Sequence, residues 1–287
     1  MLLQEIDRVK ILTKDAFLKD YFKPQKPVVF ERFVEDWPAI KKWNLDYMSK
    51  IAGDKIVPLY DDRPVDHTHG FNEPHLRMKL SEYIELIKSR PSNYRIFLWN
   101  ILKEVPVLQE DFSYPDFGLK LLKKVPMLFF GGKNSHTFMH YDIDLANIFH
   151  FHFEGEKEVL LFEPNQRNFL YKIPYSLITR EDIDFLNPDF EKWPALQQAS
   201  GYTTRLQHGN VLYMPEGYWH YMHYKTPGFS MSLRAMPQNR INFVRALYNI
   251  FFMRYFDMLM RKLIGQSWID RKNEKAIVRT HKKLAIS

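Results

Sequence analysis

The sequence contains no cysteine among its 287 residues. Disulfide bonds, thiolate metal sites and cysteine nucleophiles are therefore excluded. The first residues lack the apolar segment of a signal peptide, and no run of about 18 apolar residues suggests a membrane-spanning helix. These absences predict a cytoplasmic protein that does not enter a membrane.

Apolar and aromatic residues are abundant, at 45% and 16% of the chain, which is ample material for a folded core. The net charge is +7, and part of this excess lies in residues 271–283. A basic run of this kind is usually a solvated face, although it could also contact nucleic acid or another acidic partner.

The sequence divides into three regions that differ in their helix and strand patterns. Residues 1–125 mix helix and strand signals, including an N-capped helix after Thr13 and a helix over Leu80–Ser89. Residues 126–235 are rich in short strands, of which Phe149–Phe153 alternates Phe and His. An insert at about 165–200 carries helix signals. The pattern predicts a β-sandwich or barrel.

Residues 236–287 form a predicted C-terminal helical segment. Apolar residues recur at steps of three and four between Ile241 and Ile264, and Gly265 is a natural stop. Packing of this helix on its own barrel, a dimer interface and a membrane-surface helix are all compatible with the pattern. The apolar surface exceeds what one helix face needs, so we expect a homodimer through 241–264.

A candidate metal site combines two segments that lie far apart in the sequence. In a strand, His140 and Asp142 point to one face because side chains alternate. His220 follows a strand and a Pro/Gly turn, and in a barrel this strand can return beside the first. Two imidazoles and one carboxylate form the facial triad of non-haem Fe(II) oxygenases. The sequence therefore predicts His140, Asp142 and His220 as iron ligands.

Zinc is the competing ion. A closed zinc site usually has four nitrogen or sulfur ligands, and this sequence offers three good ligands without a thiolate. A metallohydrolase with an open fourth position remains chemically possible. His150 and His152 form a further His-x-His pair, which we expect to be structural.

Two segments around these ligands resemble the JmjC/cupin-like family. Residues 126–142 (PMLFFGGKNSHTFMHYD) are similar to the block that carries the family's His-x-Asp motif, and residues 209–220 (GNVLYMPEGYWH) are similar to its second histidine segment. The resemblance covers about residues 10–235 and is nearest to small JmjC hydroxylases, including the asparaginyl hydroxylase that inhibits hypoxia-inducible factor. It implies a double-stranded β-helix barrel, with a catalytic domain over 1–235 and a barrel core over 126–235.

The resemblance also implies residues that bind the cosubstrate 2-oxoglutarate. Thr137 and Asn147 match family positions near the cosubstrate. Lys157 matches the lysine that pairs with the distal carboxylate, and Arg234 competes for this role. The chain departs from the family at Phe97, where a cosubstrate tyrosine is usual.

The implied activity is that of an Fe(II)- and 2-oxoglutarate-dependent dioxygenase that uses O₂ to hydroxylate a protein or peptide side chain. Two alternatives stay open. One is a metal-binding cupin without oxygenase activity, which Phe97 and Arg234 would favour. The other is a JmjC protein associated with nucleic acid, which the basic run would favour and which we consider the weaker alternative.

Overall fold

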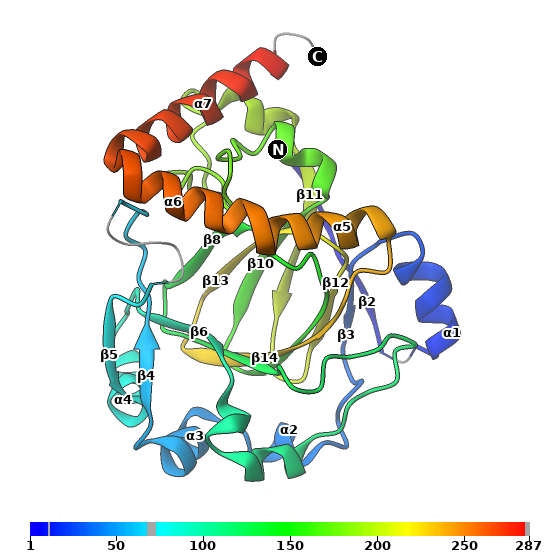
Figure 1. Cartoon of the computed structure of the whole chain (residues 1–287). Coiled ribbons are helices and arrows are strands. Elements are labelled where there is room, and N and C mark those ends of the chain that lie inside the picture. Colours follow the sequence, from blue (N-terminus) through cyan, green and yellow to red (C-terminus); the bar gives the residue numbers. More distant parts are fainter. Residues whose placement is uncertain (11, 68–72, 285–287) are drawn as a thin grey trace.

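Two β-sheets face each other and form the barrel at the centre of the molecule (Figure 1). The computed structural model describes residues 1–10, 12–67 and 73–284. The first sheet has the order β1 (Leu2–Glu5), β11 (Ser200–Leu206), β10 (Lys157–Phe162), β13 (Trp219–Tyr224) and β8 (His136–His140). The second has the order β2 (Asp7–Val9), β3 (Val28–Phe30), β12 (Val211–Met214), β9 (Asn147–Glu154), β14 (Gly228–Ala235), β7 (Met127–Gly131) and β6 (Arg95–Trp99). The expected mainly β class with a double-stranded β-helix barrel is confirmed.

The chain closes the barrel by passing from one sheet to the other. β1 and β2 are consecutive, yet β1 pairs in parallel with β11 of the first sheet and β2 pairs in parallel with β3 of the second. The buried side chain of Ile6 lies between them and joins the core between the sheets. Apolar side chains from both sheets therefore pack together inside the barrel around Ile6.

Strand β9 has two faces of different function. Phe149, Phe151 and Phe153 belong to the core outside the second sheet, whereas Ile148 and His150 face the cavity inside the barrel. The alternation that the sequence shows at these residues is the pleat of a strand buried on both sides.

The N-terminal helices cover the outer face of the second sheet. They are α1 (Lys14–Phe17), continued by the π-turn η1 (Leu18–Phe22), then α2 (Pro38–Lys42), α3 (Leu45–Ala52) and α4 (Leu80–Ser89), with the hairpin β4 (Ile56–Leu59) and β5 (Leu76–Lys79). Thr13 caps α1 by accepting a bond from the Ala16 amide, as the sequence predicts. Helix α4 has the bounds that the sequence predicts, and Leu80, Tyr83, Ile84 and Ile87 form its buried face.

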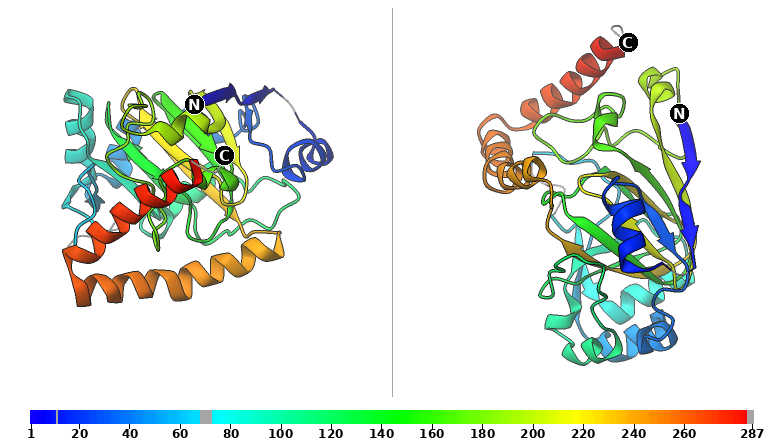
Figure 2. Two further views of the ribbon diagram at one scale, coloured as in Figure 1. Left: turned by 90° about the horizontal axis from the view of Figure 1, so that it is seen from above. Right: turned by 90° about the vertical axis from the view of Figure 1, so that its right-hand side faces the viewer.

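The C-terminal segment covers the outer face of the first sheet. It comprises α5 (Arg240–Tyr248), the π-turn η6 (Asn249–Met253), α6 (Arg254–Ile264) and α7 (Gln266–Leu284). Figures 1 and 2 show α5, η6 and α6 as one long helix beside the barrel, with α7 folded back from its end. Gly265 makes this reversal at a positive φ of 69°, as expected of a helix stop. None of the helices in the described part of the chain has the length and apolar character needed to cross a bilayer.

The insert at 165–200 differs from the expectation of helix. The structure has two short 3₁₀ turns there, η4 (Pro164–Asn168) and η5 (Pro194–Gln198), and irregular chain between them. Pro174, Pro188 and Pro194 interrupt the segment, and proline does not continue a helix. Its apolar residues Leu170, Tyr171 and Phe185 are nevertheless buried against the first sheet.

The turn after β12 connects the barrel to the C-terminal segment through one buried carboxylate. Glu216 is 2% exposed and accepts hydrogen bonds from the Asn147 side chain, from the Gln238 backbone N–H and from the Asn242 side chain. One buried acceptor group thus holds strand β9 and the start of α5 together.

We predict that Glu216→Ala lowers the free energy of unfolding by about 1–3 kcal/mol, because it leaves buried donors without an acceptor. Urea denaturation followed by circular dichroism measures the change. Glu191→Ala removes an exposed glutamate and serves as the control. Equal stability of the two variants would contradict the role of Glu216.

Candidate metal centre

The two strands β8 and β13 bring the predicted ligands together. They pair antiparallel, and His140 lies directly opposite His220 in the register. Asp142 follows β8 by two residues and therefore points to the same side as His140. The three side chains form the only group of this kind found among the described residues, with ligand atoms within 4.8 Å of one another.

The distances leave room for one metal ion. The Asp142 Oδ1 atom lies 3.7 Å from His140 Nε2 and 3.9 Å from His220 Nε2. Ligand atoms about 2.0–2.2 Å from a metal are separated by distances of this order. Two nitrogens and one carboxylate oxygen suit Fe(II) with open positions for other ligands.

Backbone carbonyls fix the orientation of both imidazoles. His140 Nδ1 lies 2.7 Å from the Phe138 carbonyl, and His220 Nδ1 lies 3.2 Å from the Tyr218 carbonyl. If each Nδ1 carries the proton that it donates, each Nε2 presents its lone pair toward Asp142. Burial lowers the pKa of His140 to about 3 and also lowers that of His220. Both rings are therefore neutral at pH 7, as metal binding requires.

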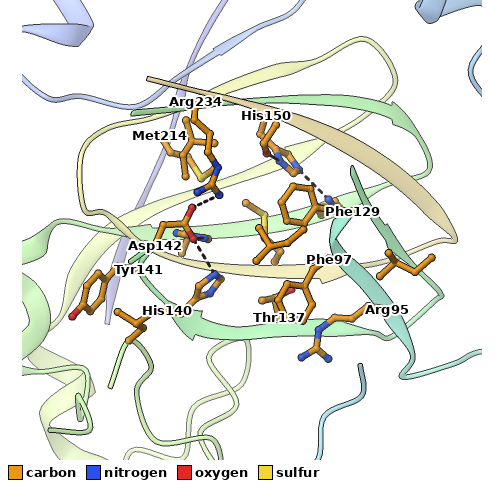
Figure 3. A pocket seen from close by; sticks show the side chains of 18 of the residues that line it. Arg95, Phe97, Phe129, Thr137, His140, Tyr141, Asp142, His150, Met214 and Arg234 are labelled. Atoms are coloured by element: carbon orange, nitrogen blue, oxygen red, sulfur yellow. Dashed lines mark hydrogen bonds and ion pairs between the residues drawn. The ribbon is translucent and has the colours of Figure 1, made fainter. Parts of the chain in front are cut away.

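Arg234 on β14 binds the carboxylate of the triad rather than facing away from it (Figure 3). Its Nη2 lies 2.6 Å from Asp142 Oδ2, and its Nη1 lies 3.0 Å from Asp144 Oδ2. Burial would raise the pKa of Asp142, but neighbouring charges, of which the Arg234 guanidinium is the largest, lower it to about 2. The guanidinium thus keeps Asp142 ionised and fixes its second oxygen.

Lys157 on β10 is a buried amine in the wall of the same cavity. It is 1% exposed, and its Nζ lies 3.0 Å from His150 Nε2, 2.9 Å from Ser230 Oγ and 4.3 Å from the centre of the Tyr224 ring. None of these groups is an anion, and no carboxylate of the described chain lies within 4.0 Å of Nζ. Burial lowers the pKa of Lys157 well below its usual value. An anionic ligand would offset this cost of burial.

The cavity between these groups has a volume of about 100 Å³. A single water needs only about 10–15 Å³ by a comparable measure, so a small organic acid is accommodated. Besides the triad, Lys157 and Arg234, the wall includes Thr137 and Phe97. Phe97, labelled in Figure 3, stands at the position where the resemblance led us to expect a tyrosine.

The structure does not bring Asn147 to this cavity. Strand β9 directs Ile148 and His150 inward, so the neighbouring Asn147 points outward. Its amide donates to Glu216 Oε1 and accepts from the Tyr213 hydroxyl. Asn147 therefore supports the fold between β9 and the C-terminal segment.

Three further polar residues at the site were not expected from the sequence. Asp144 shares Arg234 with Asp142, Tyr224 lies beneath Lys157, and Arg95 lines the cavity although it is only 3% exposed. Arg95 donates to the Asp61 carbonyl. The sequence does contain a signal for Arg95, because it begins the apolar strand Arg95–Trp99. A charged residue in a buried strand usually has a partner or a function.

Comparisons with known proteins agree with this geometry. A family model for the cupin-like domain matches residues 14–262. The chain is 31% identical over 241 residues to JmjC domain-containing protein A of Dictyostelium discoideum, covering 76% of this chain and 90% of that protein. It is 28% identical over 227 residues to lysine-specific demethylase 8 of Xenopus tropicalis, covering 76% of this chain and 50% of that protein.

A third relative is named for a different function. The chain is 28% identical over 228 residues to tRNA wybutosine-synthesizing protein 5 of Gallus gallus, covering 73% of this chain and 70% of that protein. The chain spans about half the length of the Xenopus demethylase, so its similarity there concerns the domain and not the whole protein. The matched domain, the barrel topology and the three ligands all agree: the chain belongs to the JmjC group of the cupin-like family.

Proposed function

We propose that this protein is an Fe(II)- and 2-oxoglutarate-dependent dioxygenase that hydroxylates a protein side chain. The observation that carries the proposal is a buried amine, Lys157, in the same small cavity as a His–Asp–His triad. A 2-oxo acid with a distal carboxylate has one end for the metal and another for the amine. The triad and the amine together suit one dicarboxylate. This favours a site for iron with 2-oxoglutarate over a site that binds a metal ion alone.

Each residue would have a separate task. His140, Asp142 and His220 would hold the iron, and Arg234 would orient and ionise Asp142. Lys157 would pair with the distal carboxylate, with Ser230 and Tyr224 positioning its amine. When bound, the iron with 2-oxoglutarate and O₂ supplies the oxidation of a C–H bond, with succinate and CO₂ as coproducts. The apolar walls, including Phe97 and Met222, would exclude water from the reacting group.

The names of the relatives indicate two classes of substrate. Relatives named as lysine-specific demethylases favour a protein substrate, whereas the relative named for tRNA wybutosine synthesis keeps the nucleic-acid alternative open. A metal-binding module without turnover is the other alternative. It would bind Fe(II) and 2-oxoglutarate without producing succinate. A cytoplasmic location remains a prediction.

We predict that His140→Ala, Asp142→Ala and His220→Ala each abolish Fe(II)-dependent conversion of 2-oxoglutarate to succinate. Each variant should also bind Fe(II) at least tenfold more weakly in competition with a chelator, because a three-ligand site loses a third of its donors. The control is His223→Ala, because His223 lies on the same strand as His220 but does not line the cavity. Normal iron binding in any triad variant would refute the ligand assignment.

Lys157 and Arg234 should differ in what they affect. Lys157→Ala should raise the concentration of 2-oxoglutarate required for half-maximal turnover about tenfold or more, since a charge-assisted hydrogen bond contributes about 1.5–3 kcal/mol. Arg234→Ala should weaken Fe(II) binding more than it changes this requirement, because its guanidinium contacts Asp142.

Lys225→Ala, which removes a half-exposed lysine paired with Glu158, is the control for both measurements. A larger effect of Arg234→Ala on the 2-oxoglutarate requirement would reverse the two roles.

We further propose that the long C-terminal helix forms a homodimer. Its inward side has few buried residues, namely Ala246, Asn249 and Met253, and α6 has none. The exposed side carries large apolar side chains that are 39–70% exposed: Ile241, Phe243, Val244, Leu247, Phe251, Phe252, Tyr255, Met258, Leu259 and Leu263. A monomer rarely exposes a continuous patch of this kind. A second copy of the same helix, related by a two-fold axis, would cover it with one self-complementary surface.

We predict that the protein sediments as a dimer at micromolar concentration and that Phe252→Glu converts it to a monomer of 34.6 kDa. Light scattering gives the mass, and Fe(II) binding should be unchanged because the triad lies on separate strands. Val107→Glu, at another exposed apolar residue, should leave the dimer intact. A monomeric parent protein would rule out the dimer.

A further inference from the structure

A second cavity lies on the outer side of the first sheet, between the barrel and the C-terminal helices. Its volume is about 420 Å³, which falls within the range of sites for small organic ligands. Barrel residues around Tyr141 and Trp219 form one wall, and three further segments complete it: η4 with the chain that follows it, α5 with η6, and α7. The folding of α7 back over the barrel therefore creates this space (Figure 2).

Five cations and no carboxylate line this cavity within the described residues: Arg167, Lys172, Arg245, Lys275 and Arg279. None of the five has a carboxylate partner within 4.0 Å in the described chain, whereas Lys272 on the same helix α7 pairs with Asp257. Charges that converge without compensation repel one another, and this repulsion is relieved when an anion binds.

Lys172 is the most enclosed of these cations. Its Nζ donates only to two backbone carbonyls, at 3.2 Å to Ile173 and 3.0 Å to Ser176. Burial, followed by the charges of Arg279 and Arg167, lowers the pKa of Lys172 to about 8. Lys172 lines the same cavity as Arg167 and Arg279, as the binding of one phosphate group by several cations would require.

Tyr141 connects this cavity to the metal centre. It lies between His140 and Asp142 in the sequence, and its side chain lines both cavities. Figure 3 shows its ring directed away from the triad. The Tyr141 side chain shares the second cavity with the guanidinium groups of Arg167 and Arg245. Its hydroxyl is a hydrogen-bond donor that an anion bound there could use.

We propose that this basic cavity binds a nucleoside phosphate, with the phosphates among the five cations and the base against the aromatic wall. Arginine side chains bind phosphate oxygens in a bidentate manner, and lysines add point charges. The wall also includes the rings of Tyr141, Trp219 and Tyr248, against which a planar base can pack. The cavity volume is sufficient for a free nucleotide, and one nucleotide of an RNA strand offers the same chemistry. The proposal does not depend on the oxygenase activity.

The test is calorimetric titration of the 287-residue protein with ATP, ADP, AMP and pyrophosphate, and with a short single-stranded RNA. We expect saturable binding of at least one nucleotide, with the diphosphate and triphosphate tighter than AMP. The double variant Lys275→Glu/Arg279→Glu should weaken binding at least tenfold. Both positions are exposed on α7, so the fold should tolerate the change.

The matched control is Arg271→Glu/Lys282→Glu, which makes the same charge change on exposed positions of α7 outside the cavity. It should retain nucleotide binding, as should His140→Ala, which separates this site from the metal centre. RNA that binds tenfold more tightly than free nucleotides, and is equally sensitive to Lys275→Glu/Arg279→Glu, would assign the site to a nucleic acid strand. Equal binding of pyrophosphate and ATP, or equal losses in the two double variants, would overturn the proposal.

Discussion

The register between β8 and β13 is the constraint on which the metal centre depends. It sets His140 opposite His220, so that two imidazoles from segments 80 residues apart in the sequence share one face. A shift of one residue would turn one imidazole to the other side of the sheet and leave a single histidine with Asp142. The register itself is maintained by buried neighbours such as Met139 and Trp219, which pack on the outer face of the same sheet. The chemistry of the site therefore depends on the packing of residues that do not face it.

The two buried cations at this site, Arg234 and Lys157, differ in whether an anion neutralises them. Arg234 is compensated by Asp142 and Asp144, so its charge is stable in the folded protein and contributes to the electrostatics of the triad. Lys157 has an imidazole, a hydroxyl and an aromatic ring around it, which do not neutralise a charge. An anionic ligand adds little electrostatic stabilisation to a cation that is already paired, whereas it offsets the desolvation cost of an unpaired buried amine. This difference is the physical reason for assigning the cosubstrate carboxylate to Lys157.

The C-terminal segment has two distinct surfaces because it touches the barrel along a narrow stripe. The side toward the barrel encloses the basic cavity, with Arg245 from α5 facing Lys275 and Arg279 from α7. The other side exposes large apolar residues such as Phe251 and Leu263. A dimer through the exposed side would leave the basic cavity in each subunit, so the two proposals for this segment are compatible. The basic cavity follows from the reversal at Gly265, which places α7 beside the barrel instead of extending α6.

The sequence by itself determined the fold class, the three candidate metal ligands and the limits of several helices. These features are local or periodic: the spacing of His140 and Asp142 on one strand, the cap at Thr13 and the apolar face of α4 are each contained in a few consecutive residues. Only the tertiary structure decided on which side of β9 the Asn147 side chain lies. It also decided that Arg234 pairs with two carboxylates, whereas Lys157 pairs with none in the described chain. It also decided that cations from η4, α5 and α7 converge. Partners and charges of this kind depend on contacts between distant segments, and a one-dimensional pattern does not specify which groups will lie close enough to compensate one another.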